Sequence, residues 1–231
     1  MDLVKTGIPG LDDILGGGIP FGSIVTVGGE TGTGKTTLAL QYLYSGITEY
    51  EEPGLFISFD ERKSFFYSNM KKYGWDLLKL EREKKFLFIE FPPYEVEQFI
   101  TQEEVVHEFI DELGIERLVI DQITPFALAY EKEHEQREAM QKLFEKFRKW
   151  LCTTIVLGDG IQVPGSTPKT KYGAEKLSDG FIFLYSIMRA KERLKGIEVI
   201  KMRGMKHENK VFELELSDRG AFVHPKKIIE I

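Results

Sequence analysis

The sequence predicts an α/β protein with a central, mostly parallel sheet flanked by helices and with antiparallel hairpins near the C-terminus. Three observations predict this fold class. A glycine-rich loop joins an apolar run to a helix near the N-terminus, which is the strand–loop–helix order of a phosphate loop. Apolar, strand-like runs then alternate with amphipathic stretches, a pattern typical of parallel strands joined by crossover helices. The last third has strand-like runs with turns but no long helix, which predicts hairpins.

Length and composition limit the kinds of protein that this chain can be. The chain has 231 residues, 42% of them hydrophobic, so we expect residues 1–231 to form a single domain with a full core. Its net charge of −6 gives no overall positive field to attract nucleic acid or an anionic membrane. The single cysteine, Cys152, excludes an internal disulfide, and its apolar neighbours favour a buried thiol over a nucleophile. No long apolar segment is present, so we expect a cytoplasmic protein without a signal peptide or membrane span.

The glycine-rich loop spans Gly29–Thr37, follows the apolar run Ser23–Gly28 and opens into the helical stretch Leu38–Leu43. Glycines let the backbone turn its N–H groups toward a polyphosphate, and the helix N-terminus adds its positive end. We expect Lys35 to reach the β- and γ-phosphates and the Thr36 hydroxyl to bind Mg²⁺. An ordinary Gly/Thr turn is the alternative, but the complete match to the phosphate-loop pattern in this context favours a nucleoside triphosphate site.

The segments on either side of this loop are structured. Thr6–Pro20 carries glycines and prolines that mark turns around one short apolar helix. The helix after the phosphate loop has small or apolar residues at helical spacing, which predicts one face against the sheet. These residues are Ala39, Leu43, Gly46 and Tyr50.

Two acidic residues follow the second predicted strand, Gly54–Phe59. Ligands of nucleotide-binding α/β folds lie beyond the carboxyl ends of strands, so Asp60 or Glu61 could orient or deprotonate the water that attacks a γ-phosphate. The pair could equally cap the next predicted helix, Phe65–Tyr73, which ends before Gly74. These residues alone leave both interpretations open.

Another acidic residue ends the predicted strand Arg117–Asp121. A strand at Phe86–Phe91 and an amphipathic helix at Glu103–Leu113 precede it. An apolar strand that ends in aspartate is typical of a Walker B strand, although such strands are common. Together with the phosphate loop, the pattern predicts that Asp121 holds Mg²⁺ against the Thr36 hydroxyl.

A long amphipathic helix and a buried strand, Thr153–Leu157, come next. The charged run Tyr130–Gln136 leads into the helix. Gly158–Lys171 is rich in Gly, Pro, Ser, Thr and Lys, and predicts an exposed, mobile and locally basic loop. The apolar stripe of the helix consists of Met140, Leu143, Phe144, Phe147 and Leu151.

The last third contains a basic cluster, Lys201–His207, between two predicted strands. Solvation of the surface would explain such a cluster in most proteins. A sharper interpretation is phosphate sensing, because Arg and Lys stabilise the charge that builds up during phosphoryl transfer. The predicted strands are Phe181–Ile187, Ile197–Met202, Val211–Leu216 and Ala221–His224.

Taken together, these segments resemble the RecA/DnaB-type ATPases and, within them, the KaiC-like proteins, from about Thr6 to Pro225. The Lys201–Gly204 segment with the downstream His207 is more specific than the phosphate loop, which many families share. The other motifs that carry the resemblance are Thr6–Asp12, Gly16–Pro20, the phosphate loop, Phe59–Glu61, Tyr73–Asp76, Val119–Asp121, Tyr172–Glu175, Ser178–Asp179 and Ser217–Gly220.

The resemblance implies a RecA-like P-loop fold and an Mg²⁺-dependent ATPase that forms a homo-oligomeric ring, typically a hexamer, with ATP between subunits. It implies as catalytic residues Lys35, Asp60, Glu61, Lys201 and Arg203. One subunit would bind the nucleotide and metal through Thr31, Gly32, Thr33, Gly34, Lys35, Thr36, Thr37 and Asp121. Its neighbour would bring Lys201 and Arg203 to the γ-phosphate, with Met202, His207, Ser217 and Asp218 near the nucleotide.

The chain departs from the family pattern at several positions. Asp60 stands where a glutamate is usual, and its shorter side chain sets the carboxylate back by one bond, so Glu61 is favoured as the base. Loss of a base can cost ~10² to 10⁴ in rate, so hydrolysis could be slow. Gln122 replaces a common small hydroxyl residue, and Met205 replaces a usual Thr. KaiC clock proteins have two such domains where this chain has one, so a clock role is not supported.

The leading hypothesis is a ring ATPase that couples its nucleotide state to an unknown partner protein. A second is a recombinase-like or helicase-like ATPase that binds single-stranded DNA through the loop Gly160–Lys171, although the few lysines and the lack of interleaved aromatic residues disfavour it. A third is a nucleotide-gated scaffold with little turnover. A small-molecule kinase fits less well, because no acceptor pocket or lid is indicated.

Overall fold

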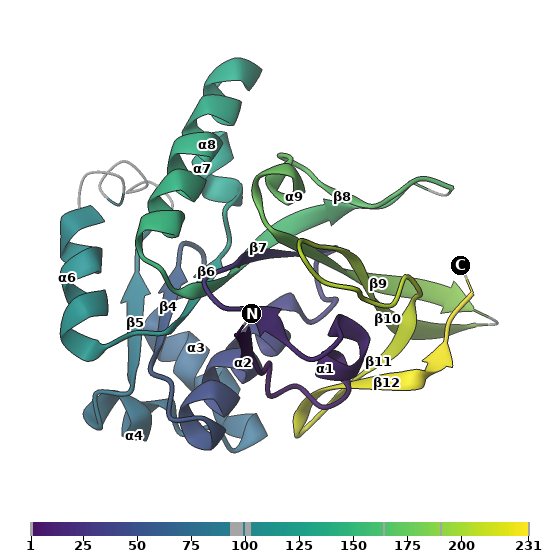
Figure 1. The fold of residues 1–231 in the computed structure, drawn as a ribbon, viewed down its shortest axis with the longest axis horizontal. Helices are drawn as coiled ribbons and strands as arrows, with labels where there is room; N and C mark the ends of the chain where they lie inside the picture. The colour runs from purple at the N-terminus through teal and green to yellow at the C-terminus, as the bar shows by residue number, and fades with distance from the viewer. Residues whose placement is uncertain (1, 93–98, 100–102, 164, 190, 231) are drawn as a thin grey trace.

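One large sheet organises the molecule. The computed structural model describes residues 2–92, 99, 103–163, 165–189 and 191–230. The strand order in the sheet is β12-β11-β10-β9-β3-β7-β6-β4-β5, with β8 paired to β7. Helices flank the sheet, and its last strands form one end of the molecule (Figure 1). The predicted fold class, a mostly parallel sheet with C-terminal antiparallel hairpins, is therefore confirmed.

The sheet has a parallel part and an antiparallel part. Neighbouring strands from β9 to β5 are parallel, and β9 to β12 form successive antiparallel pairs. The parallel strands are β3 (Ile24–Gly29), β4 (Gly54–Ser58), β5 (Phe86–Glu90), β6 (Arg117–Asp121), β7 (Thr153–Ile161) and β9 (Gly180–Arg189). The antiparallel strands are β8 (Lys169–Thr170), β10 (Glu192–Met202), β11 (Phe212–Ser217) and β12 (Gly220–Ile228), and β1 (Leu3–Val4) pairs separately with β2 (Ile19–Pro20).

Each face of the sheet packs against its own set of helices. Side chains alternate along a strand, so in β4 Phe56 joins one core while Leu55 and Ile57 join the other. The first core lies under α1 (Leu11–Leu15), α2 (Lys35–Glu49), α3 (Lys63–Met70), η1 (Lys71–Tyr73) and α4 (Leu77–Arg82). The second lies under α6 (Glu103–Leu113), α7 (Thr124–Leu128), α8 (Glu133–Lys149) and α9 (Ala174–Leu177).

Two predicted core residues are exposed. Leu151 was placed on the apolar stripe of the long helix, but α8 ends at Lys149 and Leu151 adopts a left-handed φ of 55°, so 72% of it is exposed. Tyr50 follows the end of α2 and is 40% exposed. Helical periodicity stops where the helix stops, and both residues lie beyond that point.

The predicted loop Gly158–Lys171 contains more structure than its composition indicates. Strand β7 continues to Ile161, and β8 returns antiparallel beside it. Residue 164 lies outside the described residues. Asp159 falls in the predicted loop, because the strand was expected to end at Leu157, but it belongs to β7.

Cys152 is buried, as predicted. Its Sγ donates to the Ile115 carbonyl at 3.2 Å, and burial raises the pKa of the thiol to about 12. Within the described part of the chain, none of the helices has the length and apolar character needed to cross a bilayer.

Candidate nucleotide site

The loop between β3 and α2 exposes backbone N–H groups at the start of a long helix. Gly34, at the N-cap of α2, has a φ of 102°, and no side chain caps the helix. A Cβ at Gly29 would lie 2.7 Å from the Leu184 carbonyl oxygen, so this position requires glycine. An uncapped helix N-terminus after a glycine-rich turn is suited to binding phosphate.

Two lysines are bonded to carbonyl groups of the loop itself. Lys35 Nζ donates to the Gly29 and Glu30 carbonyls at 2.8 and 3.1 Å. Burial lowers the pKa of Lys35, and the nearby carboxylates of Asp159, Asp121 and Glu30 oppose that shift. Lys195 reaches across from β10 to donate to the Gly32 carbonyl. A bound phosphate would compete for both ammonium groups.

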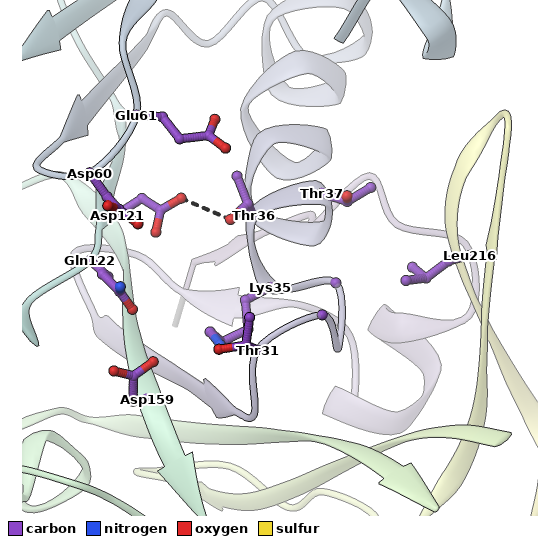
Figure 2. A pocket seen from close by; sticks show the side chains of 12 residues that line it. Thr31, Lys35, Thr36, Thr37, Asp60, Glu61, Asp121, Gln122, Asp159 and Leu216 are labelled. Carbon is purple, nitrogen blue, oxygen red and sulfur yellow. Dashed lines mark hydrogen bonds between the residues drawn. The ribbon is translucent and has the colours of Figure 1, made fainter. Parts of the chain in front are cut away.

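Thr36 and Asp121 meet as the sequence predicts. The Thr36 hydroxyl donates to Asp121 Oδ2 at 2.9 Å (Figure 2). Burial raises the pKa of Asp121 to about 7, against the opposing hydrogen bond from Thr36. A partly buried carboxylate beside a hydroxyl is the hard oxygen pair that suits Mg²⁺, whose other ligands are usually phosphate and water. The residues present therefore fit this metal.

Asp60 and Glu61 line the same pocket. The Ser58 hydroxyl accepts from the Glu61 backbone N–H at 3.0 Å, which fixes the turn after β4. Glu61 Oε2 is buried and has no hydrogen-bond partner among the described residues. Burial, then the neighbouring Asp60, raises the pKa of Glu61. A carboxylate whose pKa is raised and whose oxygen is free to accept has the properties of a general base.

The pocket also contains three residues that are not among the predicted site residues, Gln122, Asp159 and Leu216. Asp159 pairs in register with Gly29 across the β3–β7 ladder, and its Oδ2 accepts from the Thr124 hydroxyl at 2.9 Å. The parallel order of the strands was a usable signal, because it places the end of β7 next to the phosphate loop. The complete lining is Thr31, Gly32, Gly34, Lys35, Thr36, Thr37, Asp60, Glu61, Asp121, Gln122, Asp159 and Leu216.

The basic segment at the end of β10 lies at the opposite end of β3 from the phosphate loop. Met202 pairs with Gly180 in β9, and Gly180 pairs with Val25 in β3. Gly29 is four residues further along β3, a span of about 13 Å at 3.3 Å per residue. Arg203 follows Met202 and is absent from the pocket lining. Within one chain, the structure does not bring this segment to the phosphate loop.

Lys201 and Arg203 are both held at that far end. Lys201 Nζ donates to the carbonyls of Glu175 and Ser178 at 3.0 and 2.6 Å. Arg203 Nη1 donates to Asp179 Oδ1 at 3.2 Å. Burial, then the adjacent Arg203, lowers the pKa of Lys201.

A family model described as the KaiC ATPase matches residues 4–228. The chain belongs to the KaiC ATPase family. The circadian clock oscillator protein KaiC of Synechococcus elongatus is 30% identical over 230 residues, which cover 96% of this chain but 44% of that protein. A UPF0273 protein of Methanocaldococcus jannaschii is 32% identical over 245 residues and is covered completely. A crystal structure of a KaiC-like protein from Pyrococcus horikoshii OT3 superposes with a TM-score of 0.86 at 34% identity, covering 97% of this chain and 99% of that one.

The chain thus spans less than half the length of the KaiC clock proteins that it matches. Membership in the KaiC ATPase family makes ATP the nucleotide to consider at this pocket. It does not transfer the clock function, which is named for those longer proteins.

Some residues expected at the nucleotide in a KaiC-type site turn their side chains elsewhere. Thr33 is buried, and both its hydroxyl and its backbone N–H donate to the Glu30 carbonyl, at 2.7 and 3.3 Å. Met202 is 4% exposed and belongs to the first core. His207 lies in a separate hollow beside α1, which Met205 also lines.

The turn between β11 and β12 lies beside the chain's own phosphate loop. The Leu216 side chain lines the pocket, and its Cδ1 would be 2.4 Å from a Cβ at Gly34. Gln41 of α2 fastens the turn, since its side chain both accepts from and donates to the Ala221 backbone, at 2.6 and 3.1 Å. The turn that carries Ser217 and Asp218 is therefore fastened beside the pocket of its own chain.

Proposed function

We propose that this chain is a single-domain, Mg²⁺-dependent ATPase of the cytoplasm that assembles head to tail into a ring, with the hexamer as the expected size. The observation that carries the proposal is the separation of two half-sites along β3. One end holds the phosphate loop with Thr36, Asp121 and Glu61; the other holds Lys201 and Arg203. A second copy of the chain can supply Lys201 and Arg203 to the pocket of the first.

The cis half-site would bind and orient the nucleotide. The N–H groups at the start of α2 would hold phosphate oxygens, and Lys35 would exchange its loop carbonyls for the β- and γ-phosphates. Thr36 and Asp121 would hold Mg²⁺, which supplies charge neutralisation between the phosphates. Ser217 and Asp218 would lie beside the nucleotide in the same chain.

Glu61 would accept the proton of the attacking water. Its free, buried oxygen and raised pKa suit that role better than Asp60, which is exposed. The neighbour's Lys201 and Arg203 would then stabilise the charge that grows on the γ-phosphate oxygens, a role for which arginine is worth ~10³ to 10⁵ in rate.

Mixing two inactive variants tests the trans arrangement. Lys35→Ala removes the cis half-site, and Arg203→Ala removes the trans half-site. Each variant alone should lose most of its turnover while keeping the oligomeric mass seen by light scattering with ATP and Mg²⁺. In a one-to-one mixture, about a quarter of head-to-tail interfaces combine two intact half-sites, so activity should return. Lys206→Ala, a nearby exposed cation, serves as the control.

Absence of recovery in the mixture, or normal turnover of a monomeric Arg203→Ala variant, would show that no second copy completes the site. Tight ATP binding without turnover in the wild type would instead support the nucleotide-gated scaffold. Stimulation of turnover by single-stranded DNA, steeply weakened by salt, would support the DNA-binding alternative.

A further inference from the structure

Three cationic side chains converge near one carboxylate at the far end of β3. Asp179 Oδ1 accepts from Arg203 at 3.2 Å, and Oδ2 accepts from Arg148 Nη1 at 2.9 Å and from the Ile24 backbone N–H at 3.1 Å. Lys201 lies beside them. Sequence reasoning noted Asp179 only as part of a motif and did not consider Arg148, which comes from the last turn of α8.

The two arginines are held very differently. Arg148 makes a second hydrogen bond, from Nη2 to the Leu177 carbonyl at 2.8 Å, and its side chain is 41% exposed. The Arg203 side chain makes one longer hydrogen bond, to Asp179 Oδ1, and is 61% exposed, while the Arg203 backbone N–H donates to the Asp179 carbonyl at 3.0 Å. Arg148 is therefore a fixed partner of the carboxylate, whereas the side chain of Arg203 is free to leave and its backbone stays in place.

The carboxylate itself is largely shielded from water, since the Asp179 side chain is 16% exposed. A shielded anion that loses its only cation is strongly destabilised. With Arg148 and the Ile24 N–H in place, Asp179 keeps two charge-assisted hydrogen bonds when Arg203 departs. Burial raises the pKa of Asp179, but the hydrogen bonds from Arg148 and Ile24 and the charges of both arginines together outweigh it, so the pKa is lowered.

We propose that Asp179 is a holder for Arg203 and that Arg148 is the positioning residue that lets Arg203 move from this holder to the γ-phosphate of a neighbouring nucleotide. The proposal rests on the proposed function, in which Arg203 acts in trans. Arg148 touches no nucleotide in this scheme. It acts by donating a hydrogen bond to the second carboxylate oxygen of Asp179, which weakens the attraction of Asp179 for Arg203 and lets the Arg203 side chain leave.

Removing Arg148 should therefore tighten the hold on Arg203. In Arg148→Gln we expect kcat to fall on the order of tenfold, within the range of coupling between residues that share one charge network. The affinity of the cis half-site for ATP and the oligomeric mass should stay unchanged, because the phosphate loop lies at the other end of β3. Lys149→Gln, the adjacent exposed cation on α8, is the matched control and should keep wild-type kcat.

The Asp179→Asn background separates positioning from mere structural support. A neutral amide cannot hold Arg203 by charge, so adding Arg148→Gln to Asp179→Asn should not lower kcat further. If Arg148→Gln lowers kcat equally in both backgrounds, or not at all in the wild type, the holder mechanism is wrong. Arg203→Ala tests the proposed function separately. If this variant hydrolyses ATP at the normal rate, both the trans mechanism and the holder mechanism are wrong. If Arg203→Ala is inactive but Arg148→Gln is fully active, only the holder mechanism is wrong.

Discussion

Replacing Asp121 with Asn should stabilise the nucleotide-free protein. Burial raises the pKa of Asp121 from 3.8 to about 7, so between these values the folded chain keeps a proton that the unfolded chain has lost. Stability then falls as pH rises through this range. A difference of about three pKa units lowers the free energy of unfolding by about 4 kcal/mol at pH values above both the folded and the unfolded pKa. About 2 kcal/mol of this loss occurs between about pH 5 and about pH 7. Asn removes the charge and keeps an oxygen for the Thr36 hydroxyl.

Urea unfolding without Mg²⁺ or nucleotide, at about pH 5 and about pH 8, measures this effect. Asp121→Asn should gain most at about pH 8, with a flatter pH dependence than the wild type and the m-value unchanged. Asp60→Asn, an exposed carboxylate in the lining of the same pocket, should change little. If Asp121→Asn is no more stable than the wild type at about pH 8, the charge on Asp121 does not destabilise the folded protein.

Three further predictions come from individual contacts. Gly46→Ala should lower the free energy of unfolding by about 1–3 kcal/mol, because the new Cβ would lie 2.3 Å from Nε of the fully buried Arg117. This steric overlap outweighs the helix preference for Ala. Thermal or urea unfolding measures the effect, and an unchanged midpoint would contradict it. Cys152 should react with a thiol reagent only as fast as the protein opens, since its thiol is buried with a pKa of about 12, and rapid labelling of the native chain would count against that burial. Lys195→Ala should weaken ATP binding several-fold in a fluorescence titration, because the ammonium no longer orders the loop at Gly32; unchanged affinity would show that the loop is ordered without it.

Local patterns in the sequence were enough to predict the parts of the site that are contiguous in the chain. The phosphate loop could be predicted because strand, glycines and helix follow one another within a few residues. The pairing of Thr36 with Asp121 could be predicted because an apolar strand that ends in aspartate accompanies the phosphate loop, and the structure places the two side chains in contact.

The rest depended on contacts that no local pattern encodes. Asp159 reaches the pocket because β3 and β7 pair in register. Lys195 contacts the carbonyl of Gly32, a residue 163 positions away in the sequence. Arg148 looks from the sequence like any basic residue in the last turn of an amphipathic helix. Its partner, Asp179, is recognisable only once the end of α8 is placed beside the segment between α9 and β9.

The polarity of β3 has a consequence for how activity depends on assembly. In the proposed head-to-tail assembly, each copy would receive Lys201 and Arg203 from the neighbour on one side and offer its own to the neighbour on the other, because the two half-sites lie at opposite ends of β3. A row of copies open at its ends leaves one pocket without a donor, whereas a closed circle leaves none. Under this arrangement, turnover per chain should rise with protein concentration and level off once the circle closes, so that closure itself works as the switch for the last pocket.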